Sequence, residues 1–118
     1  MSEYAKLTVW KRAMELAELV YRVTASFPDT ERYGLASQSR RAAISIASNI
    51  AEGCGRRSRR DFRRFIDIAY GSLTELETQI LLSRRLGFVT APEFASVREL
   101  SEQTGQLLNG LRRSLLPR

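Results

Sequence analysis

The sequence predicts an all-α protein, folded as an antiparallel up-down-up-down four-helix bundle. Four stretches carry apolar residues at steps of three and four, the period of a helix with one buried face. The connections between them are short and contain proline or glycine, so consecutive helices are expected to run antiparallel. No stretch alternates apolar and polar residues as a strand does, and no repeat is present. We therefore expect residues 1–118 to form one domain.

The first helix is expected to begin with Thr8 as its N-cap. It should end by Phe27, because Pro28 disfavours helical geometry in the residue before it. The predicted buried stripe consists of Trp10, Ala13, Ala17, Val20 and Thr24, widened by Met14 and Tyr21.

The second helix is expected to begin between Glu31 and Leu35 and to reach about Glu52. It is rich in alanine and serine, so neighbouring helices should approach it closely on several sides. Gly53 and Gly55 are expected to end it, because glycine has access to the positive φ angles used at helix ends and tight turns.

Ser58, followed three residues later by Asp61, resembles a capping box and predicts the start of the third helix. This helix should end at Leu86, with Gly87 as its C′ residue. Its apolar face is wider than one bundle seam needs, which favours oligomerisation. That face consists of Phe62, Phe65, Ile66, Ala69, Leu73, Leu76, Ile80 and Leu81.

The fourth helix is expected to follow Thr90, where Pro92 and Glu93 complete an N-terminal signal. Its seam is narrow and resembles that of a coiled coil, with some polar members. The seam consists of Phe94, Val97, Ser101, Thr104, Leu108, Leu111 and Leu115.

Histidine is absent and Cys54 is the only cysteine, which excludes Ser-His-Asp sites, Cys-His sites and zinc sites of Cys and His within one chain. We therefore expect no catalytic residue, no metal and no cofactor. An enzyme would need a site built across subunits, with Glu52 or Glu75 as its carboxylates. The neighbouring arginines predict a lowered pKa for the Cys54 thiol, although a small turn residue is the simpler interpretation.

The N-terminus lacks the basic start, apolar middle and cleavage site of a secretory signal, so we expect a cytoplasmic protein. No apolar run approaches the roughly 20 residues that a membrane helix needs, so no membrane partner is expected.

The formal net charge of +6 is concentrated in one region. Nine arginines lie from Arg32 to Arg64 against the acidic residues Glu52 and Asp61, a net of +7, so the rest of the chain sums to −1. Helix stability does not explain this placement, because cations near a helix N-terminus oppose the macrodipole. Cationic contacts dominate affinity for nucleic acids, so we predict that an arginine run binds phosphates. The run consists of Arg56, Arg57, Arg59, Arg60, Arg63 and Arg64, with Arg40 and Arg41 as extensions.

The alternative interpretation of the arginine run is a solvated turn in which Arg60 and Arg63 pair with Glu52 and other carboxylates. Few aromatic residues interleave the run, so stacking on bases is not indicated.

Polar residues along one side of the second helix are interpreted as structural. Folding the second helix against the third would place Gln38 near Glu75, Arg41 beside Gly71 and Ser72, and Glu52 near Arg60. Gly71 would then allow close approach of the two backbones. The predicted interhelical network consists of Gln38, Arg41, Asn49, Glu52, Ser72 and Glu75.

Several motifs together resemble a known family. They include Leu7-Thr8-Val9-Trp10, Arg40-Arg41-Ala42-Ala43-Ile44-Ser45-Ile46, Asn49-Ile50-Ala51-Glu52-Gly53, Glu75-Leu76-Glu77 and Leu86-Gly87. The chain resembles the small four-helix-bundle proteins encoded in intervening sequences of bacterial 23S rRNA genes, also called the S23 ribosomal protein family. The resemblance implies a ring-shaped homopentamer. It also implies kinship with the accessory protein of diversity-generating retroelements, which binds a reverse transcriptase and nucleic acid.

The expected function is that of a non-enzymatic protein that binds RNA or DNA through phosphates, with weak sequence preference. The alternative is an oligomeric scaffold that binds a protein such as a reverse transcriptase.

Overall fold

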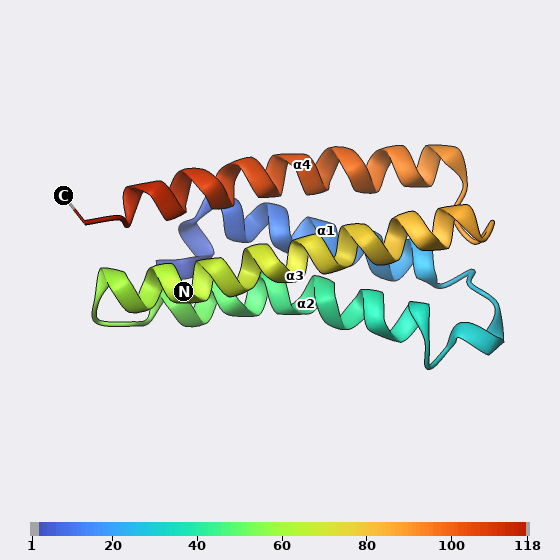
Figure 1. Ribbon diagram of the computed structural model, residues 1–118, viewed down its shortest axis with the longest axis horizontal. Helices are drawn as coiled ribbons and strands as arrows, with labels where there is room; N and C mark the ends of the chain where they lie inside the picture. Colours follow the sequence, from blue (N-terminus) through green and yellow to red (C-terminus); the bar gives the residue numbers. More distant parts are fainter. Residues whose placement is uncertain (1–2, 118) are drawn as a thin grey trace.

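Consecutive helices run antiparallel in the computed structural model, which describes residues 3–117 (Figure 1). The long helices are α1 (Thr8–Thr24), α2 (Leu35–Cys54), α3 (Arg59–Arg85) and α4 (Ala91–Ser114). Two 3-10 helices, η1 (Glu3–Lys6) and η2 (Asp29–Glu31), precede α1 and α2. No strand is present within the described range, so the predicted all-helical fold with four packed helices is confirmed.

The four helices form a square bundle with extents of 47 × 22 × 22 Å. α1 and α3 each pack against both α2 and α4, and the contact between α2 and α3 is the most extensive. Because consecutive helices are antiparallel, the α2–α3 connection and the C-terminal end of α4 lie at the same end of the bundle (Figure 1).

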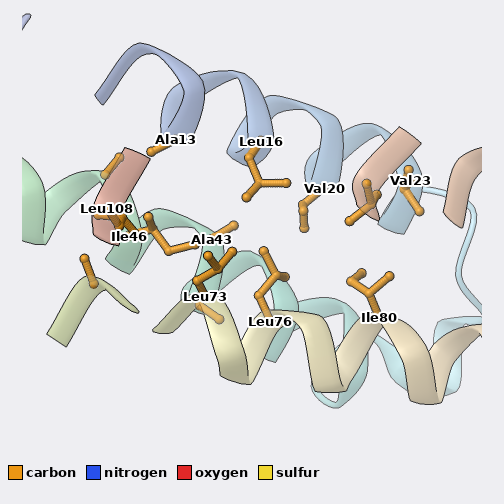
Figure 2. Packing of buried hydrophobic residues seen from close by; sticks show 14 of the residues in the cluster. Ala13, Leu16, Val20, Val23, Ala43, Ile46, Leu73, Leu76, Ile80 and Leu108 are labelled. Atoms are coloured by element: carbon orange, nitrogen blue, oxygen red, sulfur yellow. The ribbon is translucent and has the colours of Figure 1, made fainter. Parts of the chain in front are cut away.

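The core lies along the axis of the bundle and receives side chains from all four helices (Figure 2). The buried stripe of α1 differs from the predicted one, since Met14 and Tyr21 are 38% and 43% exposed. Three members of the predicted stripe, Ala13, Val20 and Thr24, are buried, while Trp10 and Ala17 are only partly buried against the core. The buried face is shifted toward Leu16, because α1 packs against α4 as well as α2. The buried residues of α1 are Val9, Ala13, Leu16, Val20, Val23 and Thr24.

The predicted C-terminal end of α3 and the predicted start of α4 are confirmed. Gly87 has a φ of +84° directly after Leu86, the C-cap residue of α3. At the start of α4, the backbone N–H of Glu93 donates to Thr90 Oγ1 at 3.3 Å. The Thr90 N–H donates in return to Glu93 Oε1 at 2.9 Å, so the capping box is complete.

The predicted N-cap of α1 was wrong. Leu7 occupies that position without a side-chain cap, and Thr8 is the first helical residue. The η1 helix precedes this end of α1 and packs against it, and Tyr4 of η1 lies edge-on to Trp10 with 5.2 Å between the ring centroids. Tertiary contact therefore holds the start of α1 where the sequence suggested a capping hydroxyl.

The predicted role of Gly53 was also wrong. It lies within α2, which continues to Cys54. Gly55 does end the helix as its C-cap, but neither glycine has a positive φ. A Cβ added at position 53 would lie 2.8 Å from the Cβ of Phe65 and 3.0 Å from Cδ1 of Phe62. Glycine is needed here for the close approach of α3, not for a turn.

Candidate nucleic-acid interface

The arginine run lies where α2 turns into α3, beside the end of α4 (Figure 1). Ser58 begins α3 as predicted, because its Oγ accepts a hydrogen bond from the Asp61 N–H at 3.0 Å. Arg56 and Arg57 lie in the short connection. The other four arginines of the run lie on the first two turns of α3.

Arg59 binds the end of α4. Its Nη2 donates hydrogen bonds to the backbone carbonyl of Ser114 and, at 3.4 Å, to that of Leu116. Carbonyls in the last turn of a helix lack partners within the helix, and the macrodipole makes this end negative. The end of α4 therefore offsets the unfavourable position of Arg59 at the start of α3, and the Arg59 guanidinium is engaged within the protein.

Arg60, Arg63 and Arg64 remain available to a ligand. They line an open depression of about 520 Å³ together with Ser58, Asp61 and Asp67. Among residues 3–117, no carboxylate oxygen lies within 4.0 Å of these three guanidinium groups.

The two acidic residues of the depression have other roles. Asp67 accepts a hydrogen bond from Nε of Arg112 on α4. Asp61 lies in the first turn of α3, where the macrodipole favours a negative charge. The depression therefore keeps a positive surface suited to a phosphate group.

Arg56 faces α2 and an aromatic ring. Its guanidinium carbon lies 4.5 Å from the Phe65 ring centroid, and its Nη2 lies 3.8 Å from a carboxylate oxygen of Glu52. Glu52 was expected near Arg60, but the i,i+4 spacing brings it to Arg56 instead. Arg64 also lies beside Phe65, at 5.7 Å. Arg57 is exposed, with no hydrogen bond or ion pair of its side chain within the described range.

Arg40 and Arg41 do not join the arginine run. Arg40 is about 14 residues before the end of α2, or roughly 20 Å along the helix axis. Its Nε donates to Thr24 Oγ1 at 2.8 Å, and its guanidinium carbon lies 4.5 Å from the Tyr21 ring centroid. Arg40 therefore fastens α2 to the end of α1.

Arg41 lies on another side of α2, in a groove of about 460 Å³ between α2 and α3. This groove contains four members of the predicted interhelical network, and its lining consists of Gln38, Arg41, Ala42, Ser45, Ser72 and Glu75. Arg41 and Glu75 form no ion pair within 4.0 Å, because Glu75 Oε1 accepts a hydrogen bond from Gln79 Nε2 at 3.1 Å.

Ser45 makes the direct link between the two helices. Its Oγ lies 2.8 Å from Oγ of Ser72, and Asn49 Nδ2 donates to the Ser45 carbonyl at 2.8 Å. Gly71 was expected to allow close backbone approach, but a Cβ there would meet no atom within 4 Å. It is exposed, so the close approach occurs at Gly53 instead.

Arg112 and Arg113 were missed by the sequence interpretation. They occupy the last turn of α4, which the antiparallel packing places beside the first turns of α3. Their signal was present in the sequence, because the last turn of an antiparallel neighbour must lie beside the start of the helix it packs against.

The single thiol also differs from expectation. Burial raises the pKa of the Cys54 thiol, and the negative charge of Glu3 raises it further. The expected lowering by arginines does not occur, because Arg56 is turned toward Phe65 and Glu52.

Metal sites and membrane-spanning helices are both absent from residues 3–117. No cluster of three or more acidic residues and cysteines is arranged to hold a metal ion there. None of the described helices is long and apolar enough to cross a membrane.

Comparison with known proteins places the chain among small bundle proteins. A family model described as 23S rRNA-intervening sequence protein matches residues 5–110. A crystal structure from Bacteroides thetaiotaomicron VPI-5482, of a protein with unknown function from the S23 ribosomal protein family, has a TM-score of 0.82. The two are 24% identical, and the match covers 89% of this chain and 95% of the other, so it shows a shared fold. No curated protein matches the chain.

Proposed function

Because the chain belongs to the family of 23S rRNA-intervening sequence proteins, we propose that it is a non-enzymatic protein that binds the phosphate backbone of RNA or DNA. The observation that carries this proposal is the depression at the start of α3. Three arginines line it without a carboxylate partner among residues 3–117, and Asp67 is paired elsewhere. Such a surface reads charge and shape, so sequence preference should be weak.

Anisotropy of a fluorescein-labelled RNA hairpin and a DNA duplex tests the proposal across a salt series. We expect log affinity to fall linearly with log salt, with similar slopes for unrelated sequences. Charge reversal at Arg60, Arg63 and Arg64 should lower affinity by at least about ten-fold near 100 mM salt.

A matched control reverses three exposed arginines elsewhere, Arg22, Arg32 and Arg85, and gives the same net charge. If the two triple variants lose affinity equally, net charge rather than the depression is responsible. Absence of binding by the wild-type protein at low salt would refute the proposed function.

We also propose that the chain assembles into a ring-shaped homopentamer. Exposed apolar side chains on α1 and α2 support self-association, and they include Met14, Tyr21 and Ile44. Light scattering should give about five times the chain mass of 13.4 kDa. A monomeric mass would contradict this assembly. The Ile44→Glu variant should form smaller species than the wild-type protein.

A scaffold for a partner protein, such as a reverse transcriptase, is the second candidate function. Tyr33 is 85% exposed just before α2, and Leu82 and Leu86 are exposed at the end of α3. These ends of α2 and α3 lie at the end of the bundle away from the arginine run (Figure 1). If the scaffold is correct, Tyr33→Ser with Leu86→Ser should abolish partner binding while the triple arginine variant retains it.

A further inference from the structure

We propose that the last turn of α4 belongs to the same phosphate-binding surface, with Arg113 as a phosphate contact and Arg59 as the residue that positions it. This inference rests on the proposed function, and it adds a second helix to the interface. The ligand is the phosphate backbone of a nucleic acid.

The first observation is the attachment of the α4 end to α3. Arg59 donates to the carbonyls of Ser114 and Leu116, on either side of Leu115, the C-cap residue of α4. Leu115 and Pro117 line a hollow of about 220 Å³ together with Arg59, Arg60 and Arg63. The end of α4 is therefore held beside the arginines that line the depression.

The second observation is the pairing of Arg112 with Asp67. Asp67 lines the depression, and an unpaired carboxylate there would repel a phosphate. Arg112 offsets that charge from α4 and provides a second connection between the two helices. Its guanidinium acts on the ligand through Asp67, so we assign Arg112 no direct phosphate contact.

The third observation is the face on which Arg113 lies. Gln106 and Asn109 of α4 line a groove with Tyr70 of α3. Arg113 follows Asn109 by four residues and Gln106 by seven, so it lies on the same face of α4. It is exposed and forms no side-chain hydrogen bond or ion pair within residues 3–117.

The contacts of Arg59 and Arg112 hold the last turn of α4 against the start of α3, and Arg113 adds to this turn a cation that is unpaired within residues 3–117. A phosphate backbone that crosses the start of α3 would therefore meet both helices. Arg59 supports their relative position because its Nη2, at the far end of the side chain, donates to two carbonyls. A lysine side chain ends one bond earlier and would not reach both.

The test measures affinity and salt dependence of the same RNA hairpin and DNA duplex from about 50 to about 200 mM salt. Arg113→Gln should reduce the slope of log affinity against log salt by about 0.9 for the duplex, the value for one phosphate contact. Affinity should fall several-fold. Arg85→Gln is the matched control, since it removes an exposed arginine from the last turn of α3 and should leave the slope unchanged.

The role of Arg59 is tested by a double-mutant cycle in binding, with circular dichroism as a check on helicity. Arg59→Lys keeps the charge but loses the bridge between the carbonyls. It should lower affinity several-fold in the wild-type background and less than about two-fold in the Arg113→Gln background, because the residue that it positions is then absent.

The outcomes separate this inference from the proposed function. If the reversal of Arg60, Arg63 and Arg64 abolishes binding while Arg113→Gln behaves like Arg85→Gln, the depression is the site and the participation of α4 is wrong. If the effects of Arg59→Lys and Arg113→Gln are additive, Arg59 does not position Arg113. Failure of the wild-type protein to bind overturns the proposed function itself.

Discussion

Gly53 of α2 lies against Phe65 of α3 so closely that a Cβ at position 53 would be 2.8 Å from that of Phe65. This is the tightest approach of α2 and α3 among the glycine positions of the two helices. It lies just before the connection that leads into the arginine run, so packing at Gly53 supports the position of the start of α3.

Replacing Gly53 with alanine is therefore expected to destabilise the protein. Overpacking costs about 1–3 kcal/mol and exceeds the gain of about 0.5–1 kcal/mol for alanine over glycine in a helix. Urea unfolding measures the difference. Gly71→Ala is the control, since a Cβ there meets no atom within 4 Å, and it should stabilise by about 0.5–1 kcal/mol. Equal effects at both positions would contradict the close approach.

Arg40→Ala should lower the free energy of unfolding by about 1–2 kcal/mol, because a charged hydrogen bond to Thr24 and a stacking contact with Tyr21 are lost. Arg41→Ala should change it by less than about 0.5 kcal/mol, since Arg41 is exposed and unpaired within residues 3–117. Urea unfolding of both variants decides the matter. If Arg40→Ala lowers the free energy of unfolding no more than Arg41→Ala does, the contact of Arg40 with α1 does not stabilise the protein.

The Cys54 thiol should react slowly with iodoacetamide near neutral pH, because its raised pKa leaves less thiolate than in an ordinary cysteine. The pH at which the alkylation rate is half-maximal reports the pKa. Glu3→Gln should lower that pH, since the charge of Glu3 is one of the two causes of the raised pKa. A half-maximal pH below the value for a free cysteine would contradict the burial of this thiol.

Glu77→Gln is expected to stabilise the protein at neutral pH. Burial and the charge of Glu102 raise the pKa of the Glu77 carboxyl, while Arg98 lowers it. A raised pKa means that the native state holds its proton to a higher pH than the unfolded chain, so Glu77 costs stability as pH rises through its folded pKa. Because Glu77 is only partly buried and solvent screens its charge, the gain should be at most about 0.5 kcal/mol.

The pH dependence tests the sign of this effect. The gain from Glu77→Gln should vanish well below the ordinary glutamate pKa of about 4.3, where both states are protonated. Thermal unfolding of the wild-type and variant proteins across this range measures it. A gain that persists at low pH would show that the effect is one of packing.

Much of the fold could be predicted because its signals are local. Ser58, Thr90 and Gly87 mark helix ends through contacts within three residues or through their own φ angle. The face that a helix buries depends on more distant neighbours. The predicted and the buried faces of α1 share Ala13 and Val20, and packing against both α2 and α4 shifts the buried face toward Leu16.

The candidate site was predicted only in part. Clustering of arginines in the sequence indicated a positive surface, and Arg60, Arg63 and Arg64 do line one depression. Arg40 and Arg59 belong to the same residue type but are engaged by α1 and α4. Which guanidinium groups find a partner depends on carbonyls and hydroxyls that are distant in the sequence, so charge alone does not identify them.

The sequence by itself determined how many helices form, where most of them end and how consecutive helices run, because periodicity, capping residues and short connections act over a few residues. Only the tertiary structure decided that Gly53 lies inside a helix contact and that Arg112 pairs with Asp67. Both depend on how closely α3 approaches α2 and α4, which side-chain packing across the bundle sets.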